Sequence, residues 1–214
     1  MAKFLYVESD GQLFLVRRDG RLALPTPEEV AFEVEERVPL NFPDHDVVFC
    51  TPVDHRFRPD WLPKDKVPGL PDVDALVHRA VNASLVREVT GAMILDRDEI
   101  LVVKASRGFT KGFWNIPGGF VLYGEAPEDG VRREVREEVG LEIEVVRPVG
   151  VYTMRFQSPY FLRAHVFLCR AATRETTPDP DEIAEVTWMS LDDAMRMTRN
   201  PFALQALREV KGQG

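Results

Sequence analysis

The chain has 214 residues, of which 44% are hydrophobic, so it is long enough for one sizeable core and a second small module. Its formal net charge is −8, and because an acidic chain does not attract nucleic-acid backbones, we expect no nucleic-acid partner. No stretch reaches the roughly 20 apolar residues that a bilayer span needs. The first residues also lack the long apolar segment of a signal peptide, so we expect no membrane contact and a cytoplasmic location.

Residues 1–72 are predicted to form a small β-rich module. Two apolar runs, at residues 3–8 and 12–17, are separated by an Asp-Gly pair, and a second Asp-Gly pair begins at Asp19. An Asp-Gly pair between apolar runs is typical of a tight turn, so we expect an antiparallel meander. The module carries fourteen acidic and nine basic side chains, which does not suit a DNA-binding head.

The stretch from Pro25 to Pro71 contains nine of the sixteen prolines. Because proline fixes φ and removes a backbone donor, we expect neither a long helix nor a central strand there. Apolar residues then recur at helical spacing from Val73 to Val81, which predicts an amphipathic connecting helix within residues 73–87.

The two cysteines, Cys50 and Cys169, are too few for a disulfide framework, and we expect both to be free thiols. His45, Cys50 and His55 lie close together in the sequence, as metal ligands often do. Their spacing matches no standard zinc pattern and a fourth strong ligand is missing. We therefore interpret them as a buried thiol and two loop histidines.

Residues 88–214 are predicted to form the main domain, in which strands enclose one highly charged helix. Ser190 is suited to cap one C-terminal helix, and the Asn200-Pro201 pair is suited to open a last one. Mixed strands around a helix, followed by helices, indicate an α+β chain arranged as an α/β/α sandwich with a mixed sheet. The strand-like runs are residues 86–96, 99–106 and 161–171.

The charged helix is expected over about residues 126–139, because a proline suits its first turn and a glycine directly follows it. Within it Glu134, Glu137 and Glu138 are spaced i, i+3 and i+4, which places three carboxylates on one face. These like charges repel, and hard carboxylate oxygens are the ligands that Mg²⁺ or Mn²⁺ prefers. The alternative is an ordinary solvated helix with alternating glutamates and arginines.

The segment from Gly119 to Leu141 contains a fixed pattern of residues, namely Gly119, Glu125, Arg133, Glu134, Val135, Glu137, Glu138, Gly140 and Leu141. This pattern resembles the signature box of the Nudix hydrolase family, and every defined position of the box is matched at its required spacing. The order of the flanking strands and helices extends the resemblance to about residues 88–210. It implies a Nudix fold with an N-terminal extension, and an enzyme that uses Mg²⁺ or Mn²⁺ to hydrolyse a diphosphate bond in a small nucleoside derivative.

The resemblance also implies a set of metal ligands. Glu137 and Glu138 would bind the ion, together with the carbonyl oxygen of Gly119. A further acidic ligand is expected from the loop before the final strand or helix, where Glu182 is preferred to Glu185.

The same resemblance implies the catalytic roles. Glu134 would be a metal ligand or the general base, and Arg133 would orient it. Glu125 would support the loop. The expected catalytic residues are therefore Glu134, Glu138 and Arg133.

The box leaves the substrate open. ADP-ribose or a similar sugar nucleotide is the first hypothesis, and dinucleoside polyphosphates and NADH are alternatives. In the family, a proline beyond the box is typical of enzymes that act on ADP-ribose, and a tyrosine is typical of those that act on dinucleoside polyphosphates. Pro159 and Tyr160 are both present and neither is well placed, so these markers do not distinguish the two substrates. Tyr152, Phe156 and Tyr160 are candidates to stack a base, although aromatic residues in such strands more often belong to the core.

Two further hypotheses concern regulation and assembly. A catalytically silent Nudix-fold sensor or regulator is disfavoured, because every acidic residue of the box is present and the N-terminal module is acidic. Edge strands and aromatic residues of that module, among them Phe42, Phe57 and Trp61, indicate a possible homodimer.

Overall fold

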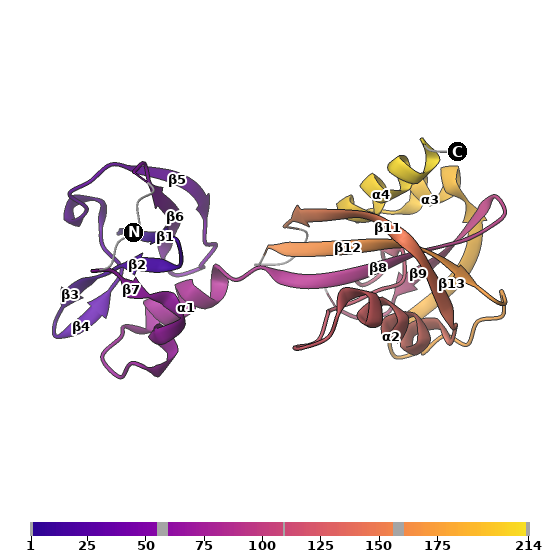
Figure 1. Ribbon diagram of the computed structural model, residues 1–214, viewed down its shortest axis with the longest axis horizontal. Coiled ribbons are helices and arrows are strands. Elements are labelled where there is room, and N and C mark those ends of the chain that lie inside the picture. The colour runs from indigo at the N-terminus through magenta and orange to yellow at the C-terminus, as the bar shows by residue number, and fades with distance from the viewer. Residues whose placement is uncertain (1, 55–59, 109, 156–160, 213–214) are drawn as a thin grey trace. The chain divides into compact units, whose positions relative to one another are not determined.

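The computed structural model describes residues 2–54, 60–108, 110–155 and 161–212. Its contacts divide the chain into two compact units, Met1–Leu85 and Val86–Gly214, whose elements are labelled in Figure 1. Among the described residues, no helix is both long enough and apolar enough to cross a membrane.

The strands of the first unit are β1 Lys3–Ser9, β2 Gln12–Phe14, β3 Val16–Arg18, β4 Arg21–Ala23, β5 Val34–Pro39, β6 Asp46–Pro52 and β7 Leu62–Pro63. Five of them form a sheet in the order β5, β6, β1, β2, β7, while β3 and β4 form a separate hairpin. Asp10 and Gly11 turn between the antiparallel β1 and β2 with positive φ angles of 48° and 71°. The tight turn predicted from the first Asp-Gly pair is therefore confirmed. Two short 3₁₀ helices occupy Pro27–Glu29 and Lys64–Gly69.

The prediction that no central strand lies between Pro25 and Pro71 is wrong. β6 is an interior strand, because it pairs with β5 on one side and, in parallel, with β1 on the other. Pro52 is the last residue of β6, so the hydrogen-bonding donors within the strand remain intact. The parallel pairing of β1 with β6 also departs from the simple meander expected here.

Helix α1, Ala75–Ala83, forms where the amphipathic pattern predicts a helix. Asp74 caps it, accepting a hydrogen bond of 2.7 Å from the backbone N–H of Leu76. Its apolar face belongs to the core of the first unit, which also contains Tyr6 and Leu13. The residues of this face are Leu76, Val77, Ala80 and Val81.

The second unit contains strands β8 Arg87–Asp96, β9 Glu99–Ala105, β10 Trp114–Asn115, β11 Ile143–Met154, β12 Leu162–Ala171 and β13 Ile183–Ser190. Its helices are α2 Pro127–Val139, α3 Leu191–Met197 and α4 Pro201–Lys211. The strand order is β10, β9, β8, β12, β11, and β13 pairs with β9. Only β8 and β12 run parallel among the described pairs, so the sheet is mixed.

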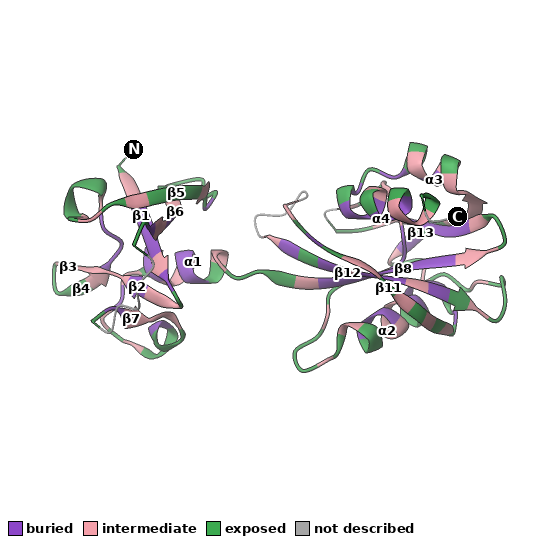
Figure 2. Cartoon of the chain, turned by 45° about the horizontal axis from the view of Figure 1, so that its top comes forward, coloured by how far each residue is buried: buried purple, intermediate pink, exposed green. Residues whose placement is uncertain are grey.

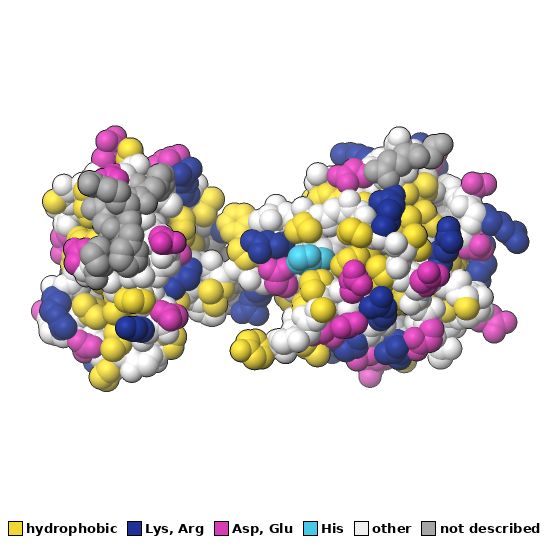
Figure 3. Space-filling model, viewed as in Figure 1, with side chains coloured by type: hydrophobic (Ala, Val, Ile, Leu, Met, Phe, Trp, Pro, Cys, Tyr) yellow, Lys and Arg dark blue, Asp and Glu magenta, His cyan; other side chains and the backbone are white. Residues whose placement is uncertain are grey.

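Helices cover both faces of this sheet, and buried residues run along the strands between them (Figures 1 and 2), whereas acidic and basic side chains are interspersed on the surface (Figure 3). Consecutive residues of β8 supply opposite cores: Ala92 packs with α2, and Met93 packs with α3 and α4. This alternation follows from the period of two in a β-strand. The predicted α/β/α sandwich with a mixed sheet is therefore confirmed, as are the capping of α3 by Ser190 and of α4 by Asn200.

Candidate active site

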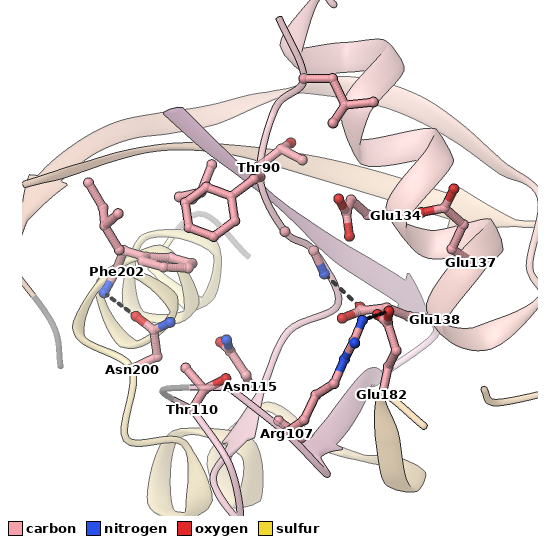
Figure 4. A pocket seen from close by; sticks show the side chains of 17 residues that line it. Thr90, Arg107, Thr110, Asn115, Glu134, Glu137, Glu138, Glu182, Asn200 and Phe202 are labelled. Carbon is pink, nitrogen blue, oxygen red and sulfur yellow. Dashed lines mark hydrogen bonds and ion pairs between the residues drawn. The ribbon is translucent and has the colours of Figure 1, made fainter. Parts of the chain in front are cut away.

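A cavity of about 330 Å³ lies in the second unit between α2, the loop that precedes it and the start of α4 (Figure 4). This volume is at the lower end of the range for small-molecule sites. The side chains drawn in Figure 4 divide the lining into an acidic side, supplied mainly by α2, and a side of apolar and amide groups near α4. The acidic residues of the lining are Glu134, Glu137, Glu138 and Glu182.

The local sequence of α2 explains why its carboxylates face the cavity. The helix begins at Pro127 and ends before Gly140, which adopts the left-handed conformation with a φ of 69°. Val131, Val135 and Val139 are fully buried against the sheet. The glutamates at i, i+3 and i+4 then lie beside this apolar stripe and line the cavity.

Burial and mutual repulsion perturb two of these carboxyl groups. Glu138 is only 9% exposed, and desolvation, reinforced by the neighbouring carboxylates, raises its pKa to about 8 against a hydrogen bond from Gly118. Desolvation also raises the pKa of Glu134, although Arg133 opposes the shift. The cluster therefore favours a bound positive charge, since such a charge would stabilise both carboxylates.

Arg133 holds the acidic turn and the preceding loop together. Its guanidinium donates to Glu125 at 2.8 Å and 2.9 Å, to Glu134 at 2.7 Å and to Glu137 at 3.1 Å. Glu125 in turn accepts from the backbone N–H of Leu122 at 2.8 Å, and these donors, Arg133 first, hold its pKa at about 2. Arg133 thus contacts Glu134, and Glu125 links Arg133 to the loop, while the orienting and supporting roles remain predictions.

Gly130, in the interior of α2, leaves room for the side chain of Glu125. A Cβ atom at Gly130 would lie 3.0 Å from Oε2 of Glu125, so a larger residue would press on the carboxylate that anchors the loop. Glycine weakens a helix relative to alanine, and the close approach of Glu125 explains why a glycine occupies this position.

The turn before α2 differs from the expectation in one respect. The carbonyl of Gly119 is not free, because it accepts a hydrogen bond of 2.8 Å from the N–H of Thr90. The carbonyl of Pro117 likewise accepts a hydrogen bond from the N–H of Ala92. The loop therefore runs beside β8, and every second carbonyl of the loop, at Pro117 and Gly119, is bonded to that strand. Among the described residues, no hydrogen bond occupies the intervening carbonyl of Gly118, which therefore joins Gly119 as a candidate ligand.

The structure separates the two candidates for the additional acidic ligand. Glu182 lines the cavity, and its carboxylate is paired with Arg107. Glu185 does not line it, and instead forms an ion pair of 2.7 Å with Lys104. We therefore retain Glu182 as the candidate ligand.

Glu182→Gln is expected to raise the Mg²⁺ concentration required for half-maximal activity several-fold, roughly tenfold if the carboxylate binds the ion directly. Glu185→Gln is the matched control, because it removes the same charge nearby and should leave the metal requirement unchanged. Metal titration of activity for both variants measures the difference. An effect at Glu185 alone would show that the wrong residue was chosen.

The side of the cavity near α4 was not predicted as a site. It contains Val89, Leu162 and the ring of Phe202, together with the amides of Asn115 and Asn200. Both amide oxygens are occupied by backbone N–H groups, those of Ile116 and Phe202 respectively. This arrangement leaves the amide nitrogens as the available donors. The capping pair Asn200-Pro201 was visible in the sequence, but its proximity to the acidic helix was not.

Of the three aromatic residues considered for stacking, the structure describes only Tyr152. Tyr152 does not line the cavity, because it is 6% exposed, belongs to the core and donates a hydrogen bond of 2.9 Å to Glu209. Phe156 and Tyr160 lie outside the described residues. Among the described residues, the aromatic side chains that line the cavity are those of Phe120 and Phe202.

The structure describes two residues of the cysteine and histidine trio, Cys50 and His45. Both cysteines are free and buried, and Cys50 donates to the carbonyl of Val48 at 3.5 Å. His45 pairs with Asp44, and His55 lies outside the described residues.

The acidic side of the cavity has the chemistry of a divalent-cation site, because hard oxygen ligands surround one space. In the described part of the chain, no three Asp, Glu, His or Cys side chains are placed so that they could together hold a metal ion. Protein donors hold the carboxylates instead, so a cation would have to displace them. These donors are Arg133 on Glu134 and Glu137, the Gly118 N–H on Glu138 and Arg107 on Glu182.

Comparison with known proteins agrees with the fold and the box. Residues 85–210 match the model of the NUDIX domain family, which is more than half of the chain. The oxidized purine nucleoside triphosphate hydrolase of Mus musculus is 36% identical over 107 residues, covering 50% of this chain and 67% of that protein. An NAD-capped RNA hydrolase of Pseudomonas aeruginosa is 37% identical over 95 residues, covering 44% of this chain and only 33% of that protein.

The solved structure of the MutT NUDIX hydrolase from Burkholderia pseudomallei has a TM-score of 0.52 and 29% identity to this chain. The match covers 59% of this chain and 99% of that one. Together with the complete box, these matches show that the chain belongs to the NUDIX domain family and is a Nudix pyrophosphohydrolase.

Proposed function

We propose that the protein uses Mg²⁺ or Mn²⁺ to hydrolyse a diphosphate bond in a nucleoside diphosphate derivative, with ADP-ribose or a similar sugar nucleotide as the first candidate. The observation that supports this proposal is the division of a single cavity. Its acidic side suits a cation and the phosphates, and its side with Phe202, Asn115 and Asn200 suits a base or sugar.

The side chains have separate roles in this proposal. Glu137, Glu138 and Glu182 hold the ion, which when bound neutralises charge on the diphosphate and lowers the pKa of water. Glu134 is the candidate base, because it lines the cavity beside the carboxylates proposed to hold the ion. Arg133 fixes the orientation of Glu134 through the hydrogen bond of 2.7 Å.

An oxidised purine nucleoside triphosphate is a second candidate substrate. The mouse relative, which this chain covers over 67% of its length, is named for that activity. Dinucleoside polyphosphates and NADH remain alternatives. A silent sensor is disfavoured, since each acidic residue of the box either lines the cavity or is bound to Arg133.

The test is to incubate the full chain and Mg²⁺ with a panel of these compounds in ¹⁸O-labelled water. The panel comprises ADP-ribose, sugar nucleotides, NADH, dinucleoside polyphosphates, and ordinary and oxidised nucleoside triphosphates. Mass spectrometry should show cleavage between phosphorus atoms, with one ¹⁸O in a phosphate product, and chelation with EDTA should stop it. Absence of turnover on every compound would refute the proposed function.

The first unit is expected to influence substrate affinity or dimerisation and to supply no catalytic acid. A truncation should be made after Leu85, because α1 packs in the core of that unit and a cut after residue 72 would expose its apolar face. We expect residues 86–214 to retain metal-dependent turnover with an altered KM or oligomeric state, measured by kinetics and light scattering. A folded, metal-binding truncation without turnover would place a catalytic group in the first unit. The homodimer and the cytoplasmic location remain predictions.

A further inference from the structure

Arg107 is the only cationic side chain among the described residues that line the cavity. It follows the end of β9 and extends from the region of Thr110 and Asn115 toward Glu182 and Glu138 (Figure 4). It therefore lies between the acidic side of the cavity and the side with the amide groups.

The partner of Arg107 is a candidate metal ligand. Nη2 of Arg107 donates to Oε1 of Glu182, so the guanidinium supplies the positive charge that this carboxylate needs when no ion is bound. A divalent cation at the acidic cluster would compete with Arg107 for Glu182. The guanidinium, once released, would still line the cavity.

Stabilisation of the fold is a weak explanation for this ion pair. The Arg107 side chain is 67% exposed and that of Glu182 is 31% exposed, and ion pairs with such access to solvent contribute little to stability. Because the guanidinium of Arg107 lines the cavity, binding of an anionic substrate explains its position better than stability does.

We infer that Arg107 binds the diphosphate of the substrate and exchanges its partner on loading, from Glu182 in the metal-free site to phosphate oxygens in the metal-bound site. The inference rests on the proposed function, because it requires a diphosphate that extends from the acidic cluster toward the amide groups. The planar guanidinium offers paired N–H donors that match two phosphate oxygens. A guanidinium at this position favours a substrate whose phosphate chain extends beyond the acidic cluster.

The test compares Arg107→Gln with wild type in binding, without turnover. The probe is α,β-methylene-ADP, whose bridging carbon resists hydrolysis, titrated calorimetrically into the full chain with Mg²⁺. Loss of one charge-assisted interaction should weaken binding roughly tenfold to a hundredfold. Arg107→Lys should recover part of the affinity, because it keeps the charge without the planar fork.

Lys111→Gln is the matched control, since it removes one positive charge from the same connection between β9 and β10 at a residue that does not line the cavity. It should bind the probe like wild type. If Arg107→Gln also binds the probe like wild type, Arg107 is only the partner of Glu182 and the inference is overturned.

Mn²⁺ binding, followed by electron paramagnetic resonance, gives a second readout. Because Arg107 competes for Glu182, Arg107→Gln should bind Mn²⁺ at least as tightly as wild type, and weaker binding would overturn the exchange. A different result would refute the proposed function without refuting the role of Arg107. If wild type binds the probe through Arg107 yet cleaves no compound of the panel, the proposed function is refuted while the role of Arg107 stands.

Discussion

Replacing Glu138 with Gln is expected to lower kcat with Mg²⁺ by roughly a hundredfold or more, because it removes a charged ligand from the centre of the acidic cluster. Gln keeps the volume and an oxygen that can accept the 2.9 Å hydrogen bond from Gly118. The thermal midpoint of the metal-free protein should stay unchanged near neutral pH, where Glu138 is mostly protonated, and rise above a pH of about 8, where the substitution removes a repelling carboxylate. Kinetics and calorimetry measure the two effects, and full activity would remove the basis of the site assignment.

Glu138 also predicts a pH dependence of stability in the metal-free protein. Burial raises its pKa from 4.5 to about 8, so the folded state binds this proton more tightly than the unfolded state. The resulting stabilisation is complete below a pH of about 4.5 and is lost as the pH rises through about 8. The midpoint of wild type minus that of Glu138→Gln should therefore fall across this range.

The exposed Glu144 provides the control for that measurement. The midpoint difference between wild type and Glu144→Gln should show no comparable fall. A difference for Glu138→Gln that stays constant with pH would contradict the raised pKa.

Gly118→Ala is expected to destabilise the second unit and to remove most of the activity. Gly118 has a φ of 146°, and an added Cβ would lie 2.1 Å from the carbonyl oxygen of Thr90, a backbone atom that cannot rotate away. Overpacking and backbone strain together cost roughly 3 kcal/mol or more. Because the N–H of Gly118 holds Glu138, a shift of the loop would also displace a candidate ligand.

Gly112→Ala separates strain from close packing. Gly112 also has a positive φ, of 78°, but nothing lies within 4 Å of an added Cβ. Its cost should be about 1 kcal/mol, with activity retained, as measured by thermal unfolding and kinetics. Equal losses of stability and activity in the two variants would show that the close packing of Gly118 against β8 is not the cause of the effect of Gly118→Ala.

The acidic helix could be predicted from sequence because its determinants are local. Pro127, Gly140 and the glutamate spacing all act within a few turns of one helix, and the box adds a strict pattern. The occupied carbonyl of Gly119 could not be predicted, because it depends on pairing with Thr90, a residue distant in the sequence.

Long-range pairing also explains the other differences. The position of β6 between β5 and β1 is set by contacts across the first unit, although proline content argued against a central strand. Asn115, Asn200 and Phe202 reach one cavity only through the packing of β10 and α4 around the sheet. No local sequence pattern indicates that these residues come together, so this side of the cavity could be identified only from the structure.

Anomalous diffraction from crystals of the full chain grown with Mn²⁺ tests the central claim most directly, namely that the acidic side of the cavity binds a divalent cation. The account predicts a peak within about 2.0–2.5 Å of carboxylate oxygens of Glu137 and Glu138, with Glu182 turned from Arg107 toward the ion. A protein that hydrolyses its substrate with Mn²⁺ but shows no peak at these carboxylates would contradict it.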